Sequence, residues 1–121
     1  MGEYLWAIKN GDLEKVEKEV EQLLQSGGTV NDDLESGRVA LHLAADYGQK
    51  EVLEYLISKG ADIDKLDKYG ISPLLAAIYE GHTSCVKLLI SKGAEYKSVK
   101  APSGDSYYDC AEKDEIKALL K

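Results

Sequence analysis

Residues 50–61 read KEVLEYLISKGA, and residues 83–94 read TSCVKLLISKGA. The six letters LISKGA at 56–61 return unchanged at 89–94, so the two copies are 33 residues apart (89 minus 56). Each copy ends an apolar stretch with a glycine, which is typical of the end of a helix. A period of this length indicates a repeat protein, in which each small unit buries its apolar face against the next one.

The same offset aligns the sequence around both copies. Residues 37–44, GRVALHLA, fall on residues 70–77, GISPLLAA, and Gly60 falls on Gly93. Residues 104–111, GDSYYDCA, align with residues 70–77 at an offset of 34. We therefore predict one domain over residues 1–121, made of four units at about 1–33, 34–66, 67–100 and 101–121.

Each unit is predicted to contain two short helices. In the third unit, Ser72 is expected to cap the first helix and Pro73 to occupy its first turn, where no N–H is needed. Gly81 is expected to end that helix. Thr83 is expected to cap the second helix, and Gly93 to follow its end.

These features resemble the ankyrin repeat family. The resemblance lies in GRVALHLAADYGQKEVLEYLISKGADID and GISPLLAAIYEGHTSCVKLLISKGA. It implies an all-α solenoid of four stacked helix-turn-helix units joined by extended hairpin-like loops. The family's Thr–His pair is split here, because His42 follows Val39 in place of Thr, and Ser72 precedes Leu75 in place of His. The usual hydrogen bond between those two side chains is therefore expected in neither unit.

The charge of the chain is concentrated in its first third. The net charge is −7, from 22 acids and 15 bases. Residues 1–35 hold nine acids and three lysines, which gives −6, and the remaining thirteen acids and twelve bases give −1. Because phosphate contacts need Lys and Arg, this distribution argues against nucleic acid or an anionic membrane as a partner. It favours a basic protein partner at the N-terminal end, or simply a solvated acidic face.

The sequence shows no pattern typical of an enzyme. It has no Ser–His–acid order, no glycine-rich phosphate loop and no HExxH. His82 and Cys85 are interpreted as packing residues, and no metal or cofactor is expected. The two cysteines lack a CxxC spacing, which favours the reducing cytoplasm, with the nucleus as a second location. No apolar run approaches the roughly 20 residues that span a bilayer.

Further strings resemble the myotrophin family of small four-repeat ankyrin proteins. They are WAIKNGDLEKV at the start, IYEGHTSCVKLLISKGA in the middle and EIKALLK near the end. This resemblance implies a protein that binds the heterodimeric actin capping protein and covers the basic surface that holds the filament barbed end. It implies sequestration of capping protein, so that barbed ends are left free to grow. A one-to-one complex is implied as well, so we expect a monomer.

The resemblance also implies that loop tips and inner helices of the N-terminal units contact the partner. Carried over by position, the expected partner-binding residues are Trp6, Glu35, Arg38, Asp46, Tyr47, Tyr79 and Glu80. Trp6, the single tryptophan, is either an anchor on the partner or part of the N-terminal packing. Glu35 and Asp46 are the preferred acidic candidates for a basic partner.

Two departures from the family bear on this surface. Tyr47 stands where the family commonly has a small Cys. The first unit is also longer, with 16 residues from Gly11 to Gly27 against 12 from Gly48 to Gly60. The four extra residues correspond to about one helical turn. We expect the apolar face of the longer helix to continue through Val16, Val20, Leu23 and Leu24.

The sequence leaves two other interpretations open. The chain could be a general ankyrin adaptor for another protein, such as a transcription factor. It could also be a consensus-like engineered repeat, although its split Thr–His pairs and irregular first unit argue against that interpretation.

Overall fold

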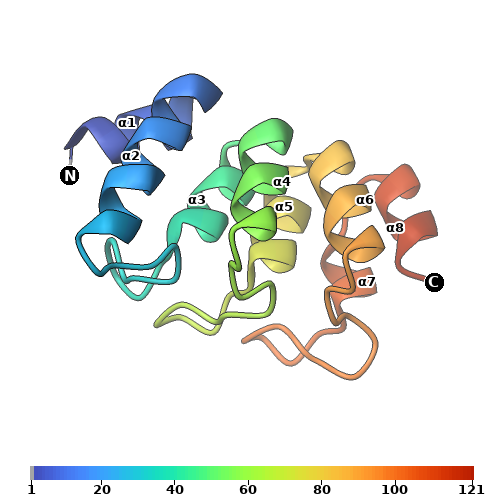
Figure 1. Cartoon of the computed structure of the whole chain (residues 1–121). Coiled ribbons are helices and arrows are strands. Elements are labelled where there is room, and N and C mark those ends of the chain that lie inside the picture. Colours follow the sequence, from blue (N-terminus) through green and yellow to red (C-terminus); the bar gives the residue numbers. More distant parts are fainter. Residues whose placement is uncertain (1) are drawn as a thin grey trace.

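The computed structural model describes residues 2–121, and this part of the chain is entirely helical apart from its loops (Figure 1). Two isolated β-bridges, Glu35 with Arg38 and Lys100 with Ser106, are the sole extended pairings among the described residues. The helices are α1 (Gly2–Asn10), α2 (Leu13–Gln25), α3 (Ala40–Asp46), α4 (Lys50–Ser58), α5 (Pro73–Glu80), α6 (Thr83–Ser91), α7 (Tyr107–Cys110) and α8 (Asp114–Leu119).

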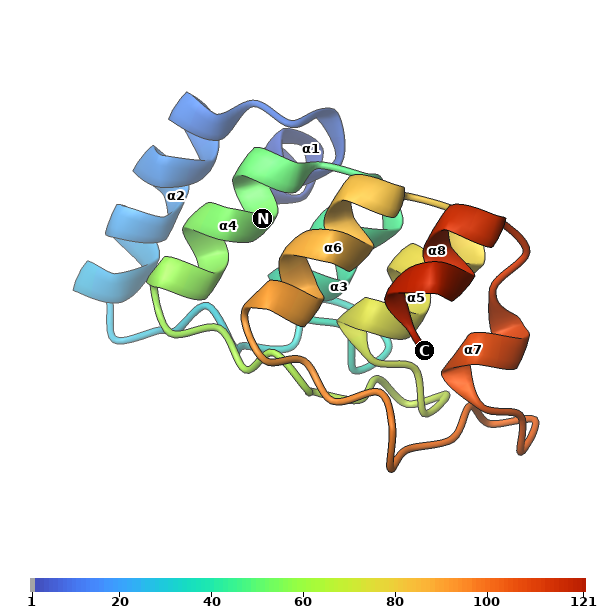
Figure 2. The ribbon, with the colours of Figure 1, turned by 90° about the vertical axis from the view of Figure 1, so that its right-hand side faces the viewer.

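The helices form two stacked rows. One row runs α1, α3, α5, α7 and the other runs α2, α4, α6, α8, and each helix contacts its neighbour along the row (Figures 1 and 2). The long loops between successive helix pairs all project from the same side of the stack (Figure 1). The all-α solenoid of four stacked helix pairs that the repeat predicts is therefore confirmed.

The ends of α5 lie where the sequence predicts them. The Ser72 hydroxyl accepts a hydrogen bond from the Leu75 N–H at 3.1 Å, and Pro73 is the first helical residue. Gly81 follows the helix with φ 72°, a left-handed conformation that is strained for any residue with a Cβ. The first N–H groups of a helix have no partner within the helix. The Ser72 hydroxyl satisfies one of them, and Pro73 has no N–H to satisfy.

The predicted cap of α6 is wrong. Thr83 is the first residue of α6, and His82 precedes the helix, since the His82 carbonyl accepts the hydrogen bond from the Val86 N–H at 3.0 Å. The Thr83 hydroxyl instead donates to a Glu115 carboxylate oxygen at 3.1 Å. The Thr83 side chain thus links two neighbouring units and caps no helix.

A different contact between neighbouring units is made by the residues that follow Gly48 and Gly81. The Gln49 amide donates to the Lys9 carbonyl at 2.8 Å, and the His82 ring Nε2 lies 2.9 Å from the Asp46 carbonyl. The ring passes so close to Gly48 that a Cβ there would lie 2.7 Å from Nδ1. Gly48, at φ 71°, is therefore required both by its backbone conformation and by this contact.

The extra residues of the first unit lengthen its second helix. Helix α2 has 13 residues and α4 has nine, which is the predicted difference of one turn. Val16 and Val20 are fully buried and Leu23 partly so. Leu24 was expected in the same stripe, but 42% of it is exposed. Because each residue turns the helix by about 100°, Leu24 falls at the edge of the stripe that Val16, Val20 and Leu23 define.

Candidate protein-binding surface

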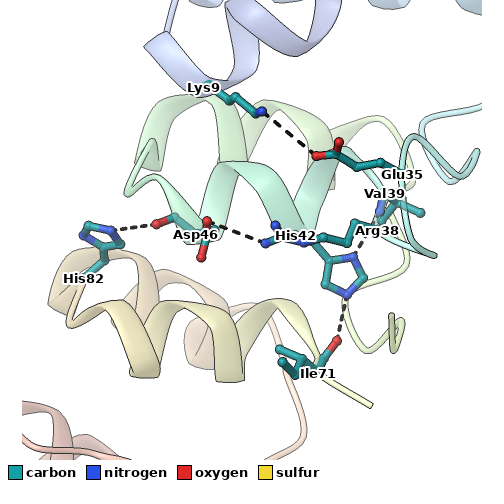
Figure 3. Close-up of polar contacts among 8 residues, drawn as sticks. All are labelled: Lys9, Glu35, Arg38, Val39, His42, Asp46, Ile71 and His82. Carbon is teal, nitrogen blue, oxygen red and sulfur yellow. Dashed lines mark hydrogen bonds and ion pairs between the residues drawn. The ribbon is translucent and has the colours of Figure 1, made fainter. Parts of the chain in front are cut away.

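The first projecting loop ends in a tight turn that places two predicted residues opposite each other. Ser36 and Gly37 both have positive φ, 54° and 75°, which is typical of a two-residue hairpin turn. The Arg38 N–H donates to the Glu35 carbonyl at 2.7 Å and closes the turn. Glu35 and Arg38 are thereby held next to helices α1 and α3 (Figure 3).

Two ion pairs connect this turn to the helices (Figure 3). Lys9, at the end of α1, approaches a Glu35 carboxylate oxygen at 4.0 Å. The Lys9 ammonium also lies 5.6 Å from the centre of the Tyr47 ring, within the range of a cation–π contact. Arg38 approaches a carboxylate oxygen of Asp46, at the end of α3, at 3.7 Å. These contacts join five residues in one group, which we call the N-terminal cluster: Lys9, Glu35, Arg38, Asp46 and Tyr47.

The two ion pairs differ in their exposure to solvent. The exposed fractions are 34% and 47% for the Lys9 and Glu35 side chains, and 23% and 28% for Arg38 and Asp46. The Arg38 Nε is buried without a hydrogen-bond partner. Because a less hydrated charge is harder to separate from its counter-ion, Asp46 is held more firmly than Glu35. Glu35 is therefore the acid of the cluster that is freer to meet a partner.

His42 lies fully buried behind the cluster and joins two loops. Its Nδ1 accepts a hydrogen bond from the Val39 N–H at 3.1 Å, and its Nε2 lies 2.9 Å from the Ile71 carbonyl (Figure 3). Since a carbonyl can only accept, the proton of the neutral ring is on Nε2. Burial lowers the pKa of His42 below its usual value. The family pattern pairs this histidine with a Thr side chain. Here His42 forms hydrogen bonds with two backbone groups, the Val39 N–H and the Ile71 carbonyl.

Trp6 lies on the surface of α1 and is 53% exposed. It borders a hollow of about 430 Å³ together with Gly2, Glu3 and Lys15. Lys15 and Glu3 form an ion pair at 3.2 Å beside it. With 53% exposed, Trp6 has surface available for contact with another molecule, and its covered part still packs on the protein.

Tyr79 and Glu80 end α5 as Asp46 and Tyr47 end α3. Tyr79 is about half exposed, and partial burial together with the neighbouring Cys110 raises the pKa of its hydroxyl. Because Cys110 belongs to α7, Tyr79 is directed toward the C-terminal helices. The structure therefore places Tyr79 apart from the N-terminal cluster.

Sequence reasoning overlooked Lys9, which connects the cluster. An alignment of the helix-ending glycines would have drawn attention to it, because Gly11 corresponds to Gly48 and Lys9 therefore to Asp46. That alignment reveals equivalent positions, but the contact with Glu35 and Tyr47 depends on how the units stack.

No metal site and no membrane span are found in the described part of the chain. Residues 2–121 contain no group of three His, Cys, Asp or Glu side chains placed to hold a metal ion. None of the helices in the same range has the length and apolar character needed to cross a bilayer.

A family model described as ankyrin repeats, in three copies, matches residues 5–100. The chain belongs to the ankyrin repeat family. Ankyrin arrays use their extended surfaces to bind other proteins, so a protein partner is the class of ligand that the family indicates. The family is a protein-interaction fold and is generally not enzymatic.

Several ankyrin proteins are similar to this chain. Myotrophin of Xenopus tropicalis is 52% identical over 60 residues, which are 50% of this chain and 48% of myotrophin. Protein fem-1 homolog A of Bos taurus is 35% identical over 105 residues, 72% of this chain and 16% of that protein. Human protein phosphatase 1 regulatory subunit 27 is 33% identical over 120 residues, 98% of this chain and 75% of that protein. The chain thus matches less than half the length of myotrophin and a small part of fem-1 homolog A.

Proposed function

We propose that this protein binds the heterodimeric actin capping protein through its N-terminal units and covers the basic surface that capping protein uses at the filament barbed end. It would act as a monomer in the cytoplasm, in a one-to-one complex that leaves barbed ends free to grow. The observation that carries the proposal is the similarity to myotrophin, 52% identity over 60 residues, joined to the motifs that resemble the myotrophin family.

The surface of the N-terminal units supports this proposal. Residues 1–35 carry nine acids and three lysines, which suits a basic partner. Glu35 presents a half-exposed carboxylate at a loop tip held by a tight turn, so a partner Arg or Lys meets it without reordering the loop. Trp6 adds a large exposed ring, the kind of side chain that often anchors a protein interface.

Calorimetric titration of purified capping protein at two salt concentrations tests the proposal. We expect one-to-one binding that weakens as salt rises, because contacts between exposed opposite charges are screened. Glu35→Lys should weaken binding by about tenfold or more, since it reverses a charge at the proposed contact. Glu54→Lys is the matched control, because it makes the same change of charge at an exposed position of α4 outside the N-terminal cluster.

A second assay tests the consequence for actin. Growth of filaments from barbed ends in the presence of capping protein should recover when this protein is added in excess. Glu35→Lys should recover growth less well than Glu54→Lys. Absence of a complex at high micromolar concentration, or equal effects of the two variants, would contradict the proposed surface.

One observation favours a second candidate function, that of an adaptor for a different protein, for example a transcription factor. The similarity to protein phosphatase 1 regulatory subunit 27 extends over 98% of the chain, whereas the similarity to myotrophin extends over 50%. An adaptor of this kind is expected to bind through the third and fourth units, and Tyr79 is an exposed residue of the third unit on which to test it. Loss of binding to such a protein in Tyr79→Ala, with Glu35→Lys unaffected, would support the adaptor function.

A further inference from the structure

The ammonium group of Lys9 lies where a basic partner would place its own charge. We propose that Lys9 is an internal competitor for Glu35, which lowers the affinity of the N-terminal cluster for basic partners. The inference rests on the proposed function, in which Glu35 meets an Arg or Lys of the partner.

The position of Lys9 is fixed by its backbone. Its carbonyl accepts the hydrogen bond from the Gln49 amide at 2.8 Å, which attaches the end of α1 to the start of α4. From there its side chain reaches both Glu35, at 4.0 Å, and the Tyr47 ring, at 5.6 Å (Figure 3). One cation therefore contacts two of the residues that are proposed to bind the partner.

The contact between Lys9 and Glu35 is weak enough to be exchanged. A separation of 4.0 Å exceeds the length of a normal N–H···O hydrogen bond, and both side chains are partly exposed to solvent. A guanidinium group of a partner, with two N–H groups in a fixed fork, would bind the Glu35 carboxylate more favourably. The Lys9 ammonium and that guanidinium would repel each other at the same carboxylate, so the partner binds more favourably when Lys9 moves away.

The Arg38–Asp46 pair does not offer the same exchange. The Arg38–Asp46 pair is shorter and less exposed than the Lys9–Glu35 pair, and the Arg38 Nε is buried. Displacement of Arg38 would leave the Asp46 carboxylate in a poorly hydrated position without its cation. Asp46 therefore acts as a positioning residue for Arg38, and Glu35 is the acid that changes its cation when a partner binds.

The test compares Lys9→Met with Lys18→Met. Both variants remove one positive charge from the first 35 residues, and methionine keeps a long apolar side chain in each. Lys18 lies on α2 and pairs with Glu14 of the same helix at 3.9 Å, outside the N-terminal cluster. A general effect of net charge would appear equally in both variants, whereas release of Glu35 would appear in Lys9→Met alone.

We expect Lys9→Met to tighten binding of capping protein by about two- to fivefold, the range set by one exposed ion pair. Lys18→Met should change it much less. If the wild-type protein binds and both variants change affinity equally, the inference is overturned while the proposed function stands. If the wild-type protein does not bind, the proposed function fails.

A short oligo-arginine peptide tests the inference whether or not capping protein binds. In ¹H–¹⁵N spectra at low salt, the peptide should shift the Glu35 and Gly37 amide signals at a lower concentration in Lys9→Met than in Lys18→Met. Equal titration curves for the two variants would overturn the proposal. Coincident thermal unfolding curves for the variants would show that the difference is not one of folding.

Discussion

The helix pairs α3–α4 and α5–α6 begin with equivalent sequences that retain opposite halves of one family motif. The former begins with GRVALHLA and keeps the histidine, and the latter begins with GISPLLAA and keeps the Ser-Pro. His42 reaches the Ile71 carbonyl in the next loop at 2.9 Å. Ser72 lies 3.0 Å from the Tyr107 hydroxyl in the unit after it. Each retained half therefore connects its unit to the following one.

The two halves of the motif provide equivalent links between units by different chemistry. His42 pairs with two backbone groups, the buried Val39 N–H on one side of its ring and the Ile71 carbonyl, which also accepts from the Asp67 N–H, on the other. Ser72 satisfies one backbone group of its own helix and the hydroxyl of Tyr107, which is almost fully buried. Neighbouring units therefore stay connected although the motif is split between them. The two retained residues, His42 and Ser72, should contribute unequally to stability.

The largest effect is expected from His42→Leu, which gives the second unit the residue that the third unit has at Leu75. The change leaves the buried Val39 N–H without its partner and removes one of the two hydrogen bonds to the Ile71 carbonyl, which keeps the bond from the Asp67 N–H. The free energy of unfolding should therefore fall by about 3 kcal/mol. Chemical denaturation measures it. A loss below about 0.5 kcal/mol would mean that water or a shifted loop replaces both hydrogen bonds.

A smaller loss, of about 2 kcal/mol, is expected from Gly48→Ala, since a Cβ there meets the His82 ring and the backbone is left-handed. Gly60→Ala is the matched control, because Gly60 also has a positive φ, 91°, but a Cβ there has no atom within 4 Å. Gly60→Ala should cost about 1 kcal/mol, the backbone strain alone. Equal losses of thermal stability in the two variants would show that the His82 contact does not constrain Gly48.

Ser72→Ala should lower the free energy of unfolding by about 1 kcal/mol, because α5 loses its side-chain cap. Part of this loss arises from the Tyr107 hydroxyl, which loses its hydrogen bond as well. The variants Ser72→Ala, Tyr107→Phe and the double variant separate the two contributions. The double variant should lose less free energy of unfolding than the two single variants lose together. Strictly additive losses would show that the hydrogen bond between the two hydroxyls contributes nothing to stability.

The smallest expected effect is a dependence of stability on pH that arises from His42 in the second unit. Burial lowers the pKa of His42 in the folded protein, and in the unfolded chain its pKa is about 6.5. The stabilising contribution is thus complete above about pH 6.5 and is lost as pH falls below that value toward the lowered folded pKa. The difference in stability between wild type and His42→Leu should narrow between about pH 7.5 and about pH 5.5. A constant difference across this range would show that the ring does not titrate with folding.

Sequence periodicity and turn residues predicted most of the fold, because these features act locally. The 33-residue offset predicted the stacked helix pairs, and Ser72, Pro73 and Gly81 marked the ends of α5 correctly. Thr83 failed as a cap because the preceding residue, His82, takes that position to reach the neighbouring unit. Leu24 failed as a core residue because it lies at the edge of the buried stripe of α2, although its side chain is apolar.

The sequence by itself determined the repeat, the family, the excess of acids in residues 1–35 and the residues expected at the surface. Only the tertiary structure decided which charges meet. Lys9 is 26 positions from Glu35 and 38 from Tyr47 in the chain (35 minus 9 and 47 minus 9), and the stacking of α1 against α3 brings all three together. Local patterns specify where a helix begins and ends, but the pairing of side chains across units depends on the geometry of the completed stack.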